Sequence, residues 1–161
     1  KIWADGVPYF LLHLPQANQT FSYKMGYFNL MNFMEFASDR WGIVNLEHSF
    51  EGFFFNKIPL LKRLKLREVI TFRAIYGGLE DKNNPNKNPG LIQFLETDDG
   101  DKITYTLEDK PYMEASVGVY NIFKLLRVDL VQRLNYLHHP NVPKMFNVDG
   151  LAIRIGAKVQ F

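Results

Sequence analysis

Adjacent histidines and a cluster of acids are the first candidates for chemistry in this sequence. His138 and His139 precede a proline in an expected loop, where neighbouring side chains cannot easily converge on one metal ion. The acids that flank Gly100 invite comparison with a calcium loop, but their spacing does not match the helix–loop–helix motif. They fit better in the turn of a hairpin that runs from Thr97 to Ile103. The acids of this group are Glu96, Asp98, Asp99 and Asp101.

Two glutamates on one expected strand are the nearest approach to a catalytic pair. Glu47 and Glu51 share a parity and could mimic the paired carboxylates of general acid–base catalysis. Charge pairing with Arg67 or Arg73 explains them more simply. The chain has no cysteine, no serine in a nucleophile elbow and no glycine-rich phosphate loop. We therefore expect a protein that is not an enzyme and that binds no metal or cofactor.

The composition narrows the class of protein further. A net charge of +2 over 161 residues gives no electrostatic basis for nucleic-acid binding. No apolar run reaches the roughly 18 residues that a membrane-spanning helix needs. The absence of cysteine fits an oxidising envelope compartment. What remains is an aromatic-rich chain whose hydrophobic residues recur mostly with a period of two, which predicts strands.

The last stretch of the chain alternates most regularly. From Leu151 to Phe161 one parity is apolar and the other is small or polar. Its 11 residues match the roughly 9–11 residues of a tilted membrane strand. Four earlier stretches repeat the pattern, and two others do so less regularly. The four are 42–54, 65–76, 113–119 and 126–136, and we expect a sixth strand in 21–36 and a partial seventh in 8–14.

The connections between these strands alternate in length, as they do in membrane barrels. The join at 122–125 is short, the join at 55–63 is intermediate, and those at 78–111 and 137–150 are long. The very short join at 37–39 breaks the rule, because it would be an outer turn. The stretch 59–66 predicts a short amphipathic turn at the membrane surface or a turn with snorkelling basic residues. Aromatic residues at strand ends fit either an interfacial belt or a soluble core, and they are Phe50, Phe53, Phe54, Phe55, Tyr112 and Tyr136.

A membrane barrel and a soluble barrel differ in the direction in which the polar parity points. In a soluble lipocalin-like barrel the apolar face points inward, whereas in a membrane barrel the polar face lines the interior. Alternation alone leaves both open. The terminal strand favours the membrane, because it ends on Phe161 without a polar tail. The residues then expected to face the lumen are Arg67, Arg73, Arg127, Asp129, Arg133, Arg154 and Lys158.

Several stretches resemble a family of outer-membrane proteins of unknown function that is typical of Bacteroidota. The most specific is FFFNKIPLL (Phe53–Leu61) followed by REV (Arg67–Val69), within a longer resembling stretch Phe28–Val69. YMEASVGVYNIFKLLRVDLVQRLNYLHHPN and LAIRIGAKVQF resemble the end of the same barrel, and more loosely the last strands of BamA-type surface-antigen barrels. The RGF-type loop motif of the BamA group is absent, so insertase activity is not carried over.

The resemblance implies a barrel of about sixteen strands, preceded by a carboxypeptidase-regulatory-like domain. It also implies that the last strand resembles the signal that the barrel-assembly machinery reads. Residues 1–161 would then be the C-terminal six or seven strands of an all-β, antiparallel transmembrane barrel, with the other strands supplied by the missing N-terminal part or by partner chains. The apolar residues of the expected signal are Leu151, Ile153, Ile155, Val159 and Phe161.

We therefore expect an integral outer-membrane protein that contacts lipid and acts in protein assembly, translocation or envelope biogenesis. A structural or accessory barrel within a larger outer-membrane complex is the first alternative. A soluble lipocalin-like carrier is the second, and independence from detergent would distinguish it.

Overall fold

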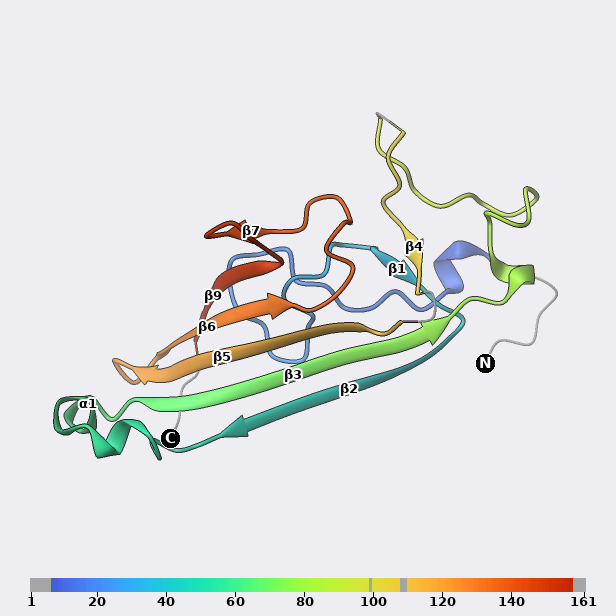
Figure 1. Ribbon diagram of the computed structural model, residues 1–161. Coiled ribbons are helices and arrows are strands. Elements are labelled where there is room, and N and C mark those ends of the chain that lie inside the picture. The colour runs from blue at the N-terminus through green and yellow to red at the C-terminus, as the bar shows by residue number, and fades with distance from the viewer. Residues whose placement is uncertain (1–6, 99, 108–109, 158–161) are drawn as a thin grey trace.

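An open antiparallel sheet of five strands forms the centre of the protein (Figure 1). The computed structural model describes residues 7–98, 100–107 and 110–157. The sheet order is β2-β3-β5-β6-β9, so each strand pairs with its neighbours in sequence among the long strands. The five strands are β2 (Arg40–Ser49), β3 (Arg67–Gly78), β5 (Tyr112–Ile122), β6 (Leu126–Arg133) and β9 (Leu151–Ala157). The alternating stretches thus predicted an antiparallel, mostly β fold correctly.

The expected count of six or seven sheet strands is wrong for the residues described. Residues 21–36 form no strand before β1 (Phe36–Ala37), and residues 8–14 contain only the short 3-10 helix η1 (Tyr9–Leu11). Both stretches carry apolar residues on both parities, so they cannot form a strand with one polar and one apolar face. The remaining strands have two residues each: β4 (Tyr105–Thr106), β7 (Lys144–Met145) and β8 (Val148–Asp149).

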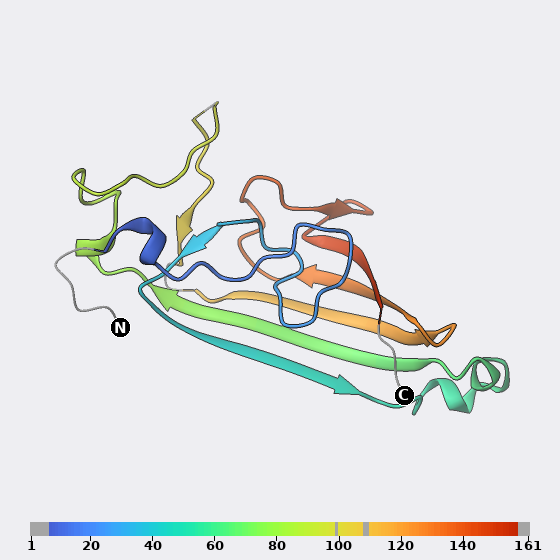
Figure 2. The same cartoon turned by 180° about the vertical axis from the view of Figure 1, so that it is seen from behind.

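Residues 7–35 lie across one face of the sheet, and we call them the covering segment. Figures 1 and 2 show this segment in blue on the same side of the strands in both views. It touches the sheet edge at β9, where Tyr23 N donates to Ile155 O over 2.8 Å. It then passes through β1 and bends at Asp39 into β2. Because β1 is not a strand of the five-stranded sheet, the stretch 37–39 is not the expected outer turn between two sheet strands. That apparent exception to the loop-length rule therefore disappears.

The main apolar core lies between the covering segment and the sheet. Phe28 and Met31 of the segment pack with Phe36, Ile75 and Tyr112. Tyr112 is fully buried here and contacts the Phe28 ring edge-on, with centroids 5.4 Å apart. Of the two alternatives for Tyr112, an interfacial belt and a core, the core is the one that holds, because its parity points to the covered face.

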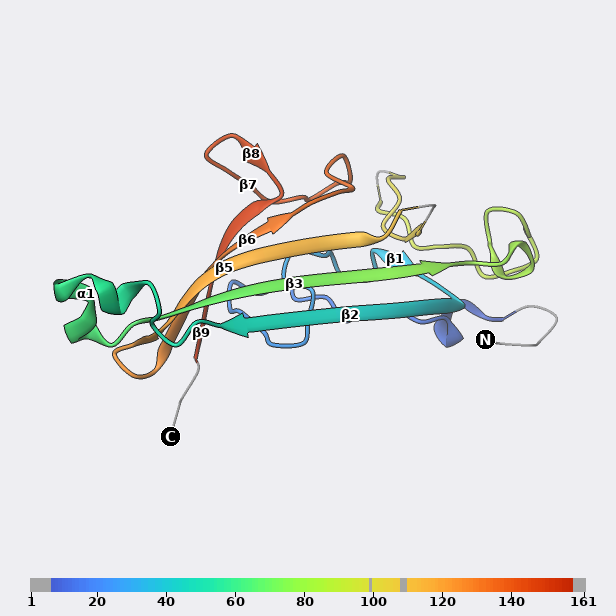
Figure 3. The same ribbon diagram turned by 60° about the horizontal axis from the view of Figure 1, so that its bottom comes forward.

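Connections of different length gather at opposite ends of the sheet (Figure 3). One end, which we call the short-turn end, carries the tight turn between β5 and β6 together with η2 (Phe55–Lys57) and α1 (Pro59–Leu64). The expected turn at 59–66 is therefore helical from Pro59 to Leu64. The other end, which we call the long-loop end, carries the two long loops. They include η3 (Asp81–Asn83) and the predicted hairpin, in which Glu96 and Lys102 pair. No helix in the described part of the chain is long and apolar enough to cross a bilayer.

Candidate functional site on the two faces of the sheet

The face of the sheet away from the covering segment is apolar and exposed. Its middle row pairs Ile70, Val117, Leu130 and Ile153 across four strands in register. Val117 has 61% of its surface exposed, an unusual degree for a valine at the centre of a sheet. Neighbouring rows contain further exposed or half-buried residues of the same kind. They are Val44, Leu46, Phe72, Ala74, Ala115, Val128, Leu151 and Ile155.

The longest strand of this apolar face can be compared with the thickness of a bilayer's hydrocarbon core. β3 has 12 residues, which makes it about 40 Å long. At a tilt of about 40° such a strand rises about 30 Å, close to the thickness of the hydrocarbon region. Tyr76 is exposed at the long-loop end of the face, and Phe53 and Phe54 are exposed at the short-turn end. The exposed apolar surface therefore has aromatic residues at both ends.

The opposite, covered face of the sheet carries charges that are buried and paired. Arg133 is fully buried and donates to both carboxylate oxygens of Glu35, over 2.5 and 3.0 Å. His139 Nδ1 lies 2.7 Å from the same carboxylate. Burial acts to raise the pKa of Glu35, but His139 and Arg133 lower it more, and the pKa lies below the ordinary 4.5. Because the folded-state pKa is depressed, this stabilisation is present above pH 4.5 and is lost as the pH falls through the lowered pKa.

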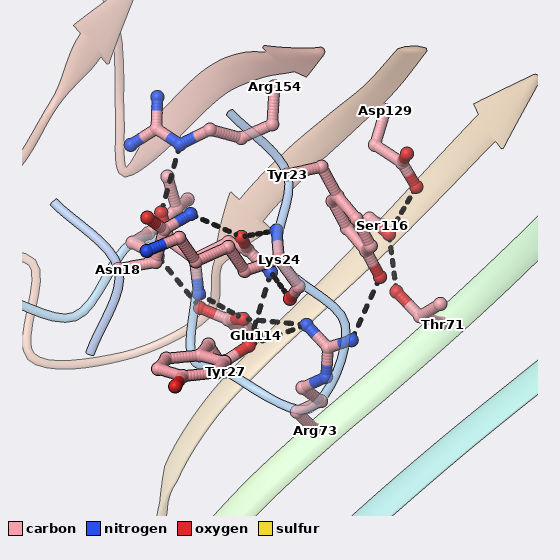
Figure 4. A network of polar contacts seen from close by, with 12 residues as sticks. Asn18, Tyr23, Lys24, Tyr27, Thr71, Arg73, Glu114, Ser116, Asp129 and Arg154 are labelled. Carbon is pink, nitrogen blue, oxygen red and sulfur yellow. Dashed lines mark hydrogen bonds and ion pairs between the residues drawn. The ribbon is translucent and has the colours of Figure 1, made fainter. Parts of the chain in front are cut away.

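A second buried pair holds the main chain of the covering segment (Figure 4). Arg73 and Glu114 are cross-strand partners on β3 and β5, with 3.7 Å between Nη1 and Oε1. The Glu114 carboxylate accepts from the backbone N–H groups of Asn29 and Leu30, over 2.7 and 3.1 Å. The Arg73 guanidinium donates to Tyr27 O over 2.7 Å. Since both charges also bond to the segment's main chain, they fasten it to the sheet.

A third group of charges lies further toward the short-turn end. Arg127 donates to Asp129 through Nε and Nη2, over 2.6 and 2.9 Å, and its Nη1 reaches Glu47 over 2.9 Å. The Tyr23 ring of the covering segment lies 4.0 Å from the Arg127 guanidinium carbon. Asp129 also accepts from Ser116, which bonds to Thr71 (Figure 4). A continuous polar network under the segment thus joins the four strands β2, β3, β5 and β6.

Gly118 provides a test of how tightly this network is packed. A Cβ at Gly118 would lie 2.7 Å from Asp129 Cγ, and Arg127 and Ser116 hold that carboxylate in place. We expect Gly118→Ala to lower the free energy of unfolding by about 1–3 kcal/mol through overpacking. Urea titration measures this value.

Gly42→Ala is the matched control, because Gly42 also lies in a strand but has no atom within 4 Å of the point that a Cβ would occupy. We expect that variant to be neutral or slightly stabilising. Equal losses for the two variants would contradict a tightly packed network at Asp129.

The structure brings most of the predicted polar residues together on the covered face. Arg154 of β9 donates to Asn29 O over 3.0 Å, beside the Glu114 network (Figure 4). Arg67 lies on the parity of the covered face, but its side chain is one-third exposed. It pairs with Glu51, and this charge pairing of Glu51 was expected from the sequence. Glu47 instead pairs with Arg127. Ile153 and Ile155 lie on the exposed face, whereas Lys158, Val159 and Phe161 lie outside the described residues.

Sequence reasoning missed three residues of the charged face. Glu114 was not named among the lumen residues, although it alternates with Ser116 and Gly118 on the polar parity of β5. Glu35 gives no such signal, because its stretch has apolar residues on both parities. His139 lies in the loop after β6, as expected, but it is buried there and its ring stacks on Tyr105, with centroids 4.0 Å apart.

The charged groups of this face are engaged with one another. Within the part of the chain that the structure describes, no three His, Asp or Glu side chains are placed to hold a metal ion. Glu68, which interrupts the apolar parity of β3, is covered by the short-turn end and accepts from Phe55 N over 2.5 Å. The arrangement is therefore suited to fixing a segment against a sheet.

These features define a mostly β protein with an open antiparallel five-stranded sheet. Residues 12–83 match the profile of the C-terminal domain of a family of unknown function (DUF5686). The match spans most of the covering segment and strands β2 and β3, and it includes the resembling stretch Phe28–Val69. No curated protein sequence and no solved structure matches the chain.

Proposed function

We propose that this chain is the C-terminal part of an integral β-barrel of the bacterial outer membrane. Its exposed apolar face contacts lipid, and its charged face points into the barrel, where the covering segment occupies the interior. The observation that carries the proposal is the contrast between the two faces, with Val117 exposed and Arg133 fully buried. A protein in water rarely leaves an apolar surface across five strands open while it buries arginines on the reverse.

The edges of the sheet indicate what the rest of the barrel must supply. β2 pairs only with β3 among the described strands. In lipid, the free backbone groups of such an edge need partners, and a closed barrel provides them. The missing strands come from the preceding part of the same protein or from partner chains.

We infer a role in protein assembly, translocation or envelope biogenesis, served by a barrel that the assembly machinery itself inserts. A structural barrel within a larger outer-membrane complex is the second candidate, and it is favoured by the covering segment, which is bonded to Arg73, Glu114 and Arg154 and so fills the interior. Reconstitution of the full-length protein with an unfolded client barrel separates the two candidates.

Cysteine labelling in intact membranes tests the membrane assignment. The sequence has no cysteine, so a single introduced thiol reports on its own position. We expect Val117→Cys to resist a charged, water-soluble maleimide in native membranes, because lipid tails exclude the reagent. The same thiol should react with an apolar maleimide that partitions into the bilayer.

Lys102→Cys, an exposed position in the long-loop hairpin, serves as the control and should react readily with the water-soluble reagent. Mass spectrometry measures the labelled fraction of each variant. Rapid labelling of both variants by the charged reagent would show that Val117 faces water and would overturn the proposal.

A further inference from the structure

A basic hollow lies at the short-turn end of the sheet, between α1 and the turn that joins β5 to β6. Asn121 Nδ2 donates to Lys65 O over 2.7 Å and so ties the two turns together. The space between them has a volume of about 840 Å³. We define the basic hollow by six of its lining residues, Arg63, Leu64, Lys65, Asn121, Phe123 and Lys124.

The charge of the basic hollow is positive and not neutralised by acids nearby. Arg63, Lys65 and Lys124 are exposed and have no carboxylate partner in the described part of the chain. Arg67 also lines the space, but it pairs with Glu51. Three cations therefore face solvent at one place, which favours an anionic ligand.

The apolar residues of the basic hollow connect it with the lipid-facing side. Phe123 has 84% of its surface exposed, and Leu64 and Leu125 are also exposed. Leu125 is followed directly by Leu126, the first residue of β6 on the exposed apolar face. A free anion in water would gain nothing from these side chains, whereas a lipid places its phosphate beside the cations and its chains beside the apolar residues.

We propose that the basic hollow binds the phosphate-bearing headgroup of an anionic phospholipid from the leaflet at the short-turn end. This inference rests on the proposed membrane function and adds a ligand class to it. Each surface cation raises the affinity for an anionic lipid about fivefold, so the three cations together account for a large part of that affinity. The attraction weakens with salt, because ions screen exposed charges.

The test compares two lipids on the full-length protein purified in a neutral detergent. Phosphatidylglycerol and phosphatidylcholine with the same acyl chains are added, and native mass spectrometry measures the bound lipid. We expect phosphatidylglycerol to bind more tightly. The triple variant Arg63→Gln, Lys65→Gln, Lys124→Gln should lose at least about tenfold in affinity for phosphatidylglycerol and little for phosphatidylcholine.

The matched control removes three exposed cations at the long-loop end, through Lys82→Gln, Lys87→Gln and Lys102→Gln. It should bind phosphatidylglycerol as the unmodified protein does. Equal loss in both variants, equal binding of the two lipids, or displacement of bound phosphatidylglycerol by millimolar inorganic phosphate would each overturn the proposal. Protection of Val117→Cys from the charged maleimide in the triple-variant background shows that the membrane assignment stands even if lipid selectivity is absent.

Discussion

Replacing Arg133 with leucine is expected to lower the free energy of unfolding by about 3–5 kcal/mol. The guanidinium is fully buried and donates to Glu35 twice, and also to the backbone oxygens of Asn135 and Tyr136. Leucine would leave the Glu35 carboxylate buried without its main cation. Urea titration of the protein folded in detergent micelles measures the change.

A double-mutant cycle with Glu35→Leu distinguishes the ion pair from simple loss of packing. The double variant Arg133→Leu, Glu35→Leu should be less destabilised than the sum of the two single variants, because no buried charge of the pair then remains unmatched. His139 loses its carboxylate partner in that variant, so recovery is expected to be partial. Additive losses would show that Arg133 and Glu35 do not depend on each other.

Replacing Val117 with arginine is expected to cost about 2–4 kcal/mol if the exposed face contacts lipid. Val117 lies in the middle row of that face, between Ile70 and Leu130 in register. On a water-exposed surface the same change would alter stability by about 0.5 kcal/mol or less. The magnitude of this one substitution therefore discriminates between the two environments, and urea titration of the protein folded into phospholipid vesicles measures it.

Phe146→Arg is the control for that measurement. Phe146 has 83% of its surface exposed in the loop between β7 and β8, away from the strand rows of the apolar face. Arginine there should be tolerated, because it meets water. If Val117→Arg proves as harmless as Phe146→Arg, the apolar face is not in contact with lipid tails.

The sequence predicted the strands that have one polar and one apolar face. It did not predict the covering segment, whose residues are packed without such a pattern. β3 and β6 were located because apolar and polar residues alternate in them, and the same alternation separated Arg127 and Arg133 from Val128 and Leu130. Tyr112 was left open between interface and core because its position at a strand end was considered without its parity, which it shares with Glu114.

The covering segment could not be derived from local pattern. Its main contacts are long-range and use backbone groups, such as the Asn29 and Leu30 N–H groups bonded to Glu114. Backbone donors carry no side-chain signature, so no spacing of residue types announces them. Glu35 could not be found from local pattern either, because its partner Arg133 lies 98 positions later in the chain.

The buried charges of β3 and β5 depend on main-chain groups of the covering segment for their hydrogen bonds. Withdrawing residues 27–30 would leave Arg73 and Glu114 without most of the groups that solvate them, and would uncover Tyr112. Such a state is unfavourable unless water replaces every lost bond. Segment and strands therefore form one cooperative unit, and hydrogen exchange at the Leu30 amide should be as slow as at the amides of β5.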